Sequence, residues 1–345
     1  MKIRLTQIDG KLPNLALMKL AHWHRAKGDE VFFERSVTKG MFEPEYDTVY
    51  GSTIFSSSQK KVKLFKQIFP NALIGGTGIG DLKLTVEQII GVPSYENYDY
   101  SIYPEFDHSI GFTQRGCRLR CSFCVVPKKE GKLRESNTIS QLWRGPGYPK
   151  KLHLLDNDFF GQPNWKDRCQ EIIDGNFKVC FNQGINVRLI TDEVAEYLSK
   201  IKYYDDQFKK RRLYTAWDNK NDEKIFTTGV NKLLSVGIVP NHIMVYMLCG
   251  FWKKETFDDV FYRFKKMIDM GLRPYPMVYE GEEVDKEYLL KLKKFQRWVI
   301  GRYYEFIDWS IYQKQNEKVY YNNKSQNLRL PLKFDVDGSG DVISA

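Results

Sequence analysis

The residues with the clearest chemistry are three cysteines that stand close together. Cys117, Cys121 and Cys124 form the pattern CxxxCxxC. Three thiolates at this spacing can hold three irons of a cubane [4Fe–4S] cluster and leave the fourth iron free to bind a small molecule. Basic side chains nearby would favour the thiolate form and offset the negative charge of the cluster. Those basic residues are Arg115, Arg118 and Arg120.

Two other interpretations of the three cysteines remain open. A zinc site would need a fourth ligand, for which His108 is a candidate. Zinc sites prefer paired CxxC or Cys-His arrangements, so the pattern favours iron and sulfur. The other interpretation is a chance group of buried thiols. The remaining cysteines, Cys169, Cys180 and Cys249, are scattered, and we expect them to act as small apolar residues of the core.

The composition is that of a folded protein of two or three domains. The chain has 345 residues, 42% of them hydrophobic, and its 53 basic and 43 acidic residues leave a formal charge of +10. This excludes a disordered chain and allows a large core. The longest apolar runs fall far short of the roughly 20 residues that a membrane-spanning helix needs, and charged residues stand where a signal peptide would be apolar. We therefore expect a cytoplasmic protein with no membrane partner.

Strand-like and helix-like segments alternate over residues 1–91. The predicted strands cover residues 2–9, 31–34, 48–55 and 72–74, and the predicted helices cover 14–27 and 59–69. Short alternating units indicate a parallel sheet covered by helices, which is a doubly wound α/β domain. The turn Gly75-Gly76-Thr77-Gly78 either lets the backbone approach a phosphate or ring, or is a tight turn at the sheet edge. Residues 92–106 predict an irregular linker.

A second α/β pattern with a longer period covers residues 107–283. Its predicted strands lie at residues 109–113, 151–155, 178–182, 213–217, 242–248 and 273–278. Six β/α units predict a barrel or partial barrel, whose active site lies at the carboxyl ends of the strands. Residues 284–345 form a basic, helical C-terminal extension with a predicted helix over 286–304. The cysteines directly follow the first of these strands.

At the cysteines the sequence resembles the radical S-adenosylmethionine (SAM) superfamily. The family pattern is CxxxCxxC with an aromatic residue before the last cysteine, which is Phe123 here. The resemblance covers residues 107–281 and implies a partial (β/α)6 TIM-like barrel. It also implies a cluster whose open iron binds SAM, and a one-electron reduction that yields a 5′-deoxyadenosyl radical. The radical would take a hydrogen atom from an unidentified substrate, in a methyl transfer or another C–H functionalisation, with flavodoxin or ferredoxin as electron donor.

The resemblance further implies that side chains at the strand ends bind SAM. Asp156 and Asp158 follow the second strand, where such enzymes hold the SAM amino group, although an acidic pair here is equally a helix cap or a turn. Gln183 and Arg188 follow the third strand. Arg188 would pair with the SAM carboxylate through two hydrogen bonds, or else form a surface ion pair. Gly250, after the fifth strand, would let the backbone approach adenine.

Residues 1–80 are similar to the Rossmann-like cobalamin-binding domain that precedes the barrel in one class of radical SAM enzymes. The similar features are the short first strand, the helix around residues 17–21, the strand at 48–55 and the glycine-rich turn. Cobalamin would then be a further cofactor. Two differences argue against it: the domain is shorter than the full one, and the chain has no Asp-x-His-x-x-Gly motif for the cobalt ligand.

Two other functions compete with this one. A methylthiotransferase-like enzyme that modifies RNA or protein has similar domains, but those enzymes carry three more cysteines in the N-terminal domain, and no cysteine precedes Cys117 here. A non-catalytic nucleic-acid-binding protein with a structural metal site is the other, because the chain is basic and contains runs such as 209–212. Its base-stacking side chains would be Phe295, Trp298, Tyr303, Tyr304, Phe306 and Trp309. Their helical spacing predicts instead that they pack against the barrel, which disfavours a nucleic-acid partner.

Overall fold

The computed structural model describes residues 1–80, 84–281 and 283–314. It has the mixed α/β fold with parallel sheets that the alternation of segments predicts. The chain divides into two compact units, which are described separately: Met1–Gly111 with Pro146–Pro149, and Phe112–Gly145 with the described residues from Lys150 onward. No helix within the described ranges has the length and apolar character needed to cross a membrane.

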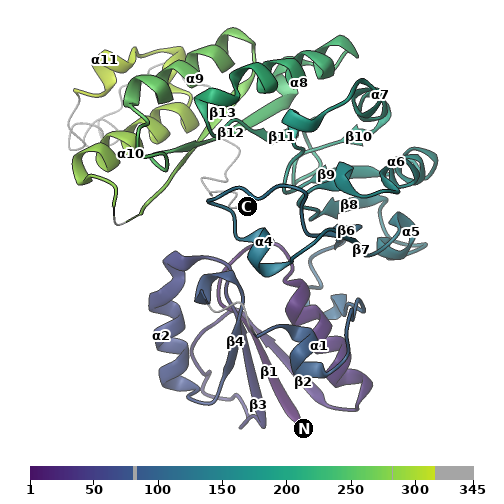
Figure 1. Cartoon of the computed structure of the whole chain (residues 1–345). Coiled ribbons are helices and arrows are strands. Elements are labelled where there is room, and N and C mark those ends of the chain that lie inside the picture. Colours follow the sequence, from purple (N-terminus) through teal and green to yellow (C-terminus); the bar gives the residue numbers. More distant parts are fainter. Residues whose placement is uncertain (81–83, 282, 315–345) are drawn as a thin grey trace, which may run out of the picture. The chain divides into compact units, whose positions relative to one another are not determined.

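The first unit is built on a parallel sheet of four strands in the order β2-β1-β3-β4 (Figure 1). Its strands are β1 (Lys2–Gln7), β2 (Glu30–Glu34), β3 (Thr48–Ser52) and β4 (Leu73–Gly75). The short strand β5 (Ser109–Gly111) is not part of this sheet. Its α-helices are α1 (Leu15–Ala26), α2 (Gln59–Ile68) and α3 (Val86–Ile90). Asn14 begins α1 by accepting a hydrogen bond from the backbone N–H of Leu17. The strands and helices predicted over residues 1–80 are therefore present.

A different helix covers each face of this sheet. Ile3 and Leu5 of β1 are fully buried in the apolar cluster that α1 completes. Ile8, just after β1, packs instead with Phe65 of α2 in a separate cluster. Because successive side chains of a strand point to opposite faces, the two clusters lie on opposite sides of the sheet. A parallel sheet needs such cover on both faces.

The segment expected to be a linker packs onto the first unit. Ile102 and Tyr103 are both 5% exposed and belong to its core. The hydroxyl of Tyr103 donates to Gln7 Oε1 at 2.8 Å and accepts from the backbone N–H of Asn14 at 3.1 Å. The segment packs in this way because burying its aromatic side chains in the first unit stabilises the packed arrangement.

The glycine-rich turn after β4 is shaped by contacts within the chain. Gly76 has φ +104°, and a Cβ atom there would overlap the carbonyl oxygen of Thr53. At Gly78 a Cβ atom would lie 2.7 Å from the carbonyl oxygen of Phe55. Both glycines are needed for the close approach of the turn to the segment after β3, which favours the tight-turn interpretation.

The second unit contains two parallel sheets and a short antiparallel pair (Figure 1). Strands β8 (Lys151–Leu154), β9 (Lys178–Phe181) and β10 (Lys202–Tyr203) lie in one sheet, and β11 (Leu213–Ala216), β12 (Ile243–Cys249) and β13 (Arg273–Val278) in the other. The antiparallel pair is β6 (Gln114–Arg115) with β7 (Arg134–Glu135). The helices are α4 (Val126–Lys129), α5 (Ile139–Leu142), α6 (Trp165–Asp174), α7 (Asp192–Lys200), α8 (Glu223–Ser235), α9 (Phe257–Asp269), α10 (Lys286–Ile300) and α11 (Trp309–Tyr312). The five strands predicted between residues 151 and 278 are confirmed.

The strands of the second unit have one face buried against helices and one lined by aromatic rings. On β12, Val245 and Met247 are fully buried in the large core cluster. Tyr246, between them, stacks on Tyr214 of β11 with the ring centroids 5.9 Å apart. The three scattered cysteines are 0% exposed, which confirms that they belong to the core: Cys169, Cys180 and Cys249.

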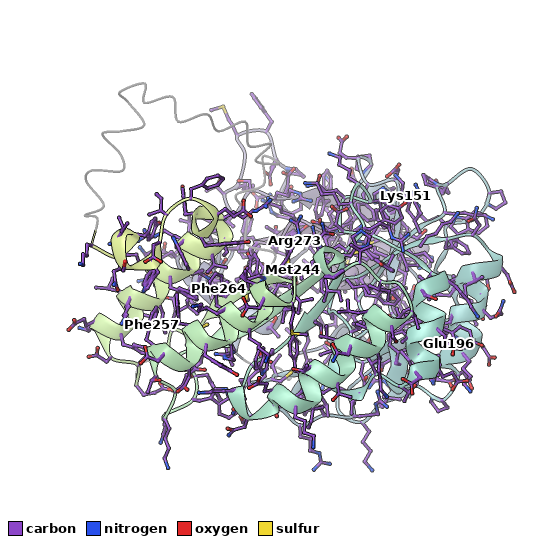
Figure 2. All side chains as sticks on the ribbon, turned by 90° about the horizontal axis from the view of Figure 1, so that it is seen from above. Lys151, Glu196, Met244, Phe257, Phe264 and Arg273 are labelled. Carbon is purple, nitrogen blue, oxygen red and sulfur yellow. The ribbon has the colours of Figure 1, made fainter. Side chains whose placement is uncertain are left out.

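Aromatic side chains of the C-terminal extension pack against α9. Phe295, Trp298 and Trp309 are 0%, 3% and 6% exposed. They contact Phe257 and Phe264 of α9, which Figure 2 labels, at ring-centroid distances of 5.2 to 5.5 Å. The predicted packing is thus confirmed for these three side chains, which are not available to stack on bases. Residues 315–345 of the extension lie outside the described residues.

Candidate functional site

The three cysteines lie in the loop that connects β6 to β7. We call residues 116–133 the cysteine loop. Its two ends are held together because Arg115 pairs with Arg134 in the antiparallel ladder. The loop contains three free, partly exposed thiols, namely Cys117, Cys121 and Cys124.

Asp156, which follows β8, holds the segment that leads into the cysteine loop. Its Oδ1 accepts hydrogen bonds from the backbone N–H groups of Thr113 at 2.9 Å and Gln114 at 2.6 Å, and from the Thr113 hydroxyl at 2.7 Å. The side chain is 3% exposed, and this burial raises the pKa of Asp156 to about 7 although the hydrogen bonds oppose the shift. These partners lie 42 and 43 positions away along the chain, so the contacts are neither a helix cap nor a local turn, and they tie the segment after β8 to the entry of the cysteine loop.

Asp158 forms a two-point ion pair with Arg118 of the cysteine loop. Arg118 Nε donates to Oδ2 at 2.7 Å and Nη2 donates to Oδ1 at 3.0 Å. The Asp158 side chain is 2% exposed, whereas that of Arg118 is 41% exposed. Gly161 leaves room for the pair, because a Cβ atom there would overlap Asp158 Oδ2 and lie 2.8 Å from Arg118 Nε. Both predicted aspartates therefore contact the cysteine loop or its entry.

A third carboxylate, that of Glu130, lies within the cysteine loop and accepts hydrogen bonds that hold the start of the loop in place. It accepts from Nε and Nη2 of Arg115 at 3.1 Å each, from the backbone N–H of Gly116 at 3.0 Å, and from Asn157 Nδ2 at 3.1 Å. Glu130 is not one of the residues that the cysteine motif indicates. One signal was available, because Glu130 is the single acidic residue among seven basic ones in residues 115–134.

Arg188 reaches the cysteine loop from the segment after β9. Its Nη2 lies 3.8 Å from Cys121 Sγ, and its Nη1 lies 3.2 Å from Asp222 Oδ2. Burial lowers the pKa of Arg188, but Cys121 and Asp222 outweigh burial, so the pKa is raised overall. The ion pair with Asp222 is one of the two roles expected for this residue. The guanidinium also lies against a thiol.

Phe123 contacts the segment that follows β12. Its ring meets those of Phe251 and Trp252 edge-on, at centroid distances of 5.6 and 6.3 Å. Phe251 in turn packs edge-on against Tyr279 at 5.0 Å. Aromatic contacts of this kind hold the ring next to Cys124 in a fixed place without hydrogen bonds.

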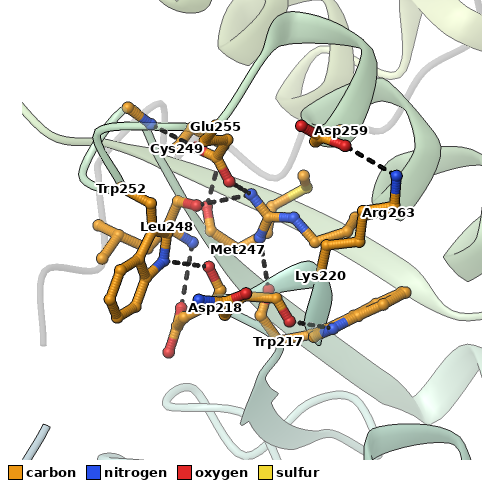
Figure 3. Close-up of polar contacts among 12 residues, drawn as sticks. Trp217, Asp218, Lys220, Met247, Leu248, Cys249, Trp252, Glu255, Asp259 and Arg263 are labelled. Carbon is orange, nitrogen blue, oxygen red and sulfur yellow. Dashed lines mark hydrogen bonds and ion pairs between the residues drawn. The ribbon is translucent and has the colours of Figure 1, made fainter. Parts of the chain in front are cut away.

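A buried polar network shapes the ends of β11 and β12 (Figure 3). Arg263 is 0% exposed and donates to the carbonyl oxygens of Trp217 at 2.6 Å and Leu248 at 2.8 Å. It also pairs with Glu255 Oε1 at 2.5 Å, while Oε2 accepts from the backbone N–H of Gly250 at 2.8 Å. Gly250 has φ +84°, and a Cβ atom there would lie 2.8 Å from Leu292 Cδ1. Packing against α10 therefore already accounts for this glycine.

Asp218 connects this network to the aromatic contacts of the cysteine loop (Figure 3). Its Oδ1 accepts from the backbone N–H of Leu248 at 3.1 Å, and its carbonyl oxygen accepts from Trp252 Nε1 at 2.8 Å. Burial raises the pKa of Asp218. Its charge also contributes to the raised pKa of Cys124, after burial of the thiol, which is the main cause.

Two other candidate residues have different surroundings. Gln183 is exposed, because the chain turns at Gly184, which has φ +79° and where a Cβ atom would lie 2.8 Å from the carbonyl oxygen of Tyr214. His108, the candidate fourth zinc ligand, lies in the first unit with its Nε2 at 3.0 Å from Asp107 Oδ1. Gln183 has no described contact with the cysteine loop.

The donor set fits iron–sulfur chemistry, although the thiols are not gathered into a metal-binding group. Burial raises the pKa of Cys117 and of Cys124, and the neighbouring thiols raise both further. In the part of the chain that the structure describes, no three His, Cys, Asp or Glu side chains form a group that could hold a metal ion. The raised pKa values differ from the expectation that Arg115 and Arg118 favour the thiolate form, because these two side chains pair with Glu130 and Asp158 instead. The case for a cluster therefore rests on the three thiols and their spacing.

Comparisons with models of protein families, with curated proteins and with solved structures found no match to this chain.

Proposed function

We propose that this chain is a radical SAM enzyme. The observation that carries the proposal is the convergence of strand ends on the cysteine loop. Asp158 after β8, Arg188 after β9 and Trp252 after β12 all contact this loop. In α/β folds, residues at the carboxyl ends of parallel strands build the active site. The segments that follow the strands therefore contact the cysteine loop, and in a fold of this kind these segments would build the active site.

We further propose the finer arrangement of a Rossmann-like unit followed by a partial barrel. The order β2-β1-β3-β4 is typical of doubly wound domains of the flavodoxin type. In the second unit, the backbone N–H of Ile185 donates to the carbonyl oxygen of Tyr214 at 2.7 Å. This bond joins the segment after β9 to β11 and links the two sheets, as an open barrel would need.

In this proposal Cys117, Cys121 and Cys124 would hold a [4Fe–4S] cluster, and the chemistry that the cluster would supply when bound is one-electron reductive cleavage of SAM. The other side chains of the site would hold the cysteine loop in position and shield it from water. Asp156 and Asp158 fix the entry and the wall of the cysteine loop, Arg188 supplies a positive charge beside Cys121, and the ring of Phe123 excludes water next to Cys124. Flavodoxin or ferredoxin is the proposed electron donor.

The first unit does not fit cobalamin, and we propose chemistry without it. The carboxyl end of its sheet is closed by contacts within the chain. Asp9 accepts from the Thr53 hydroxyl at 2.6 Å and from the backbone N–H groups of Ile54 at 2.7 Å and Phe55 at 3.0 Å. The space in front of Gly76 is filled by Thr53. The glycines of this turn thus serve packing rather than a bound ring.

Each of the two competing functions lacks an observation that favours it. A second cluster of the methylthiotransferase type would need cysteines before Cys117, and the chain has none. A base-stacking surface on the C-terminal extension would need several exposed rings, whereas Phe295, Trp298 and Trp309 are buried, Tyr303 and Tyr304 are half-buried, and Phe306 is the exposed one of the six candidates. The radical SAM proposal is therefore the one that the residues support best.

The proposal is tested by replacing each cysteine of the pattern in turn. Cys117→Ala, Cys121→Ala and Cys124→Ala should each lose iron on anaerobic reconstitution and form no 5′-deoxyadenosine from SAM. Cys169→Ala is the matched control, because Cys169 is fully buried in α6, away from the loop, and should keep both iron and activity. Wild-type 5′-deoxyadenosine formation by any of the first three variants would refute the assignment.

A further inference from the structure

The cysteine loop carries more positive charge than three cysteines and a cluster would explain. Residues 115–134 contain seven basic side chains and one acidic one, and thus hold +6 of the chain's formal +10. The acidic side chain, Glu130, is already engaged with Arg115, Gly116 and Asn157. It is therefore not positioned to neutralise the remaining cations.

Four of these cations line one pocket together with Cys117. The pocket has a volume of about 520 Å³ and lies wholly within the second unit. Its basic side chains are Arg118, Arg120, Lys128 and Lys132. Volumes of this size are typical of small-molecule sites. A hollow of this kind fits a compact ligand better than it fits the flat surface of a protein partner.

One wall of the pocket is rigid. Arg118 is held by the two hydrogen bonds to the buried carboxylate of Asp158, and Gly161 gives that pair its space. Gly116, with φ +81°, lets the backbone of Lys132 come close, since a Cβ atom at Gly116 would lie 2.6 Å from the Lys132 carbonyl oxygen. The backbone that bears Lys132 is therefore held beside Cys117. Such preorganisation lowers the entropy lost when a ligand binds.

The other cations of the pocket have no partner among the described residues. Arg120, Lys128 and Lys132 form no ion pair or side-chain hydrogen bond with another described residue. Asp158 offsets the charge of Arg118, which leaves three uncompensated positive charges around one hollow. A single carboxylate would balance only one of them, whereas two linked phosphates carry about two to three negative charges.

We propose that this pocket binds the phosphate groups of a small phosphorylated molecule. Arg120 supplies planar donors that suit phosphate oxygens, and Lys128 and Lys132 supply point charges, while Arg118 is held by Asp158 as part of the wall. The binding of this molecule does not depend on the proposed function. The further inference that the molecule is the substrate rests on the proposed function.

The test is equilibrium binding of inorganic pyrophosphate to the full chain after anaerobic reconstitution with iron and sulfide. Wild-type protein should bind, and Arg120→Gln, Lys128→Gln and Lys132→Gln should each weaken binding about tenfold, the loss expected for one charge-assisted hydrogen bond. Lys224→Gln is the matched control, because Lys224 is an exposed lysine of α8 that does not line the pocket, and it should bind as wild type does.

Three results would overturn the inference: no binding to wild-type protein, equal binding by all variants, or binding to iron-free protein that disappears on reconstitution. The last would mean that the cations serve the cluster. Reduction by flavodoxin that depends on Lys128, without pyrophosphate binding, would assign the surface to a protein partner and would also overturn the inference.

Iron and 5′-deoxyadenosine are measured on the same samples, so that this inference and the proposed function can fail separately. Protein that binds pyrophosphate but neither holds iron nor cleaves SAM would refute only the proposed function, and protein that cleaves SAM without binding pyrophosphate only this inference.

Discussion

The guanidinium of Arg188 lies with Nη2 at 3.8 Å from Cys121 Sγ, although the two residues are 67 positions apart in the sequence. One comes from the segment after β9 and the other from the cysteine loop. The same guanidinium pairs with Asp222 at 3.2 Å, just before α8. A positive charge is thereby fixed beside a thiol by two different parts of the second unit.

Variants of Arg188 and Asp222 distinguish the proposed role of Arg188 in SAM binding from its ion pair with Asp222. Arg188→Gln should raise the KM for SAM about tenfold, because a charge-assisted pair with the SAM carboxylate is lost. Asp222→Asn breaks only the ion pair, which is 28% exposed on the arginine side and 31% on the aspartate side, and should change stability by no more than about 1 kcal/mol. The measurement is 5′-deoxyadenosine formation as a function of SAM concentration. Equal KM values for the two variants would mean that Arg188 forms only an ion pair.

Asp156 should make the stability of the iron-free protein depend on pH. Burial raises the pKa of its carboxyl to about 7, against roughly 3.9 in an unfolded chain. Between these values the folded protein keeps a proton that the unfolded chain releases, so stability falls as pH rises from about 4 to 7. Asp156→Asn keeps the Oδ1 acceptor and removes this titration.

The prediction for Asp156 is checked by comparing Tm at pH 5 and pH 7.5 in both proteins. Wild-type protein should lose more Tm than Asp156→Asn over this interval, with roughly 2–4 °C for each kcal/mol in a unit of this size. Asp174→Asn, at the end of α6, controls for removal of a carboxylate outside the buried site. Parallel curves for wild type and Asp156→Asn would show that Asp156 does not titrate in this range.

Gly161→Ala should loosen the cysteine loop, because the added Cβ atom would overlap Asp158 Oδ2 and displace the carboxylate from Arg118. Overpacking of this kind typically costs about 1–3 kcal/mol. The loop is rich in lysine and arginine, so trypsin should cut within residues 116–133 faster in the variant. Asp158→Asn should show the same acceleration, and Gly75→Ala should not, because a Cβ atom there makes only an ordinary contact with the Leu84 carbonyl oxygen at 3.4 Å. Unchanged cleavage in Gly161→Ala would show that the pair does not hold the loop.

The packing of the C-terminal extension predicts a large difference between two aromatic residues. Trp298 is 3% exposed and its Nε1 donates to the carbonyl oxygen of Ile307 at 2.9 Å, so Trp298→Ala should destabilise the protein by about 3–5 kcal/mol. Phe306 is 59% exposed, and Phe306→Ala should stay within about 0.5 kcal/mol of wild type. Urea unfolding followed by circular dichroism measures both. A small loss for Trp298→Ala would contradict the packing described here.

Much of the fold could be predicted from the sequence, because apolar periodicity determines its strands. The predicted strand at 273–278 has the same ends as β13, and the strand expected at 242–248 begins and ends within one residue of β12. The strands β6, β7 and β10 could not be predicted. Each has two residues, too few for a periodic pattern, and each depends on pairing with a distant segment.

The candidate site was predictable in its residue types but not in its partners. The cysteine pattern and the acidic residues after β8 are visible in the sequence. That Asp158 would pair with Arg118, 40 positions away, depends on tertiary structure. Gln183 was expected at the mouth of the barrel from its position after a strand, but the left-handed turn at Gly184 leaves it exposed. Counting residues past a strand end does not give the direction of a side chain when such a turn follows.

The most direct test of the central claim is one measurement on wild-type protein. The chain is reconstituted anaerobically with iron and sulfide, its iron is counted, and 5′-deoxyadenosine is assayed after reduction in the presence of SAM. The account predicts about four irons per chain and formation of 5′-deoxyadenosine. Bound zinc with no cleavage of SAM would contradict it and would leave a basic α/β protein whose three clustered cysteines have a structural role.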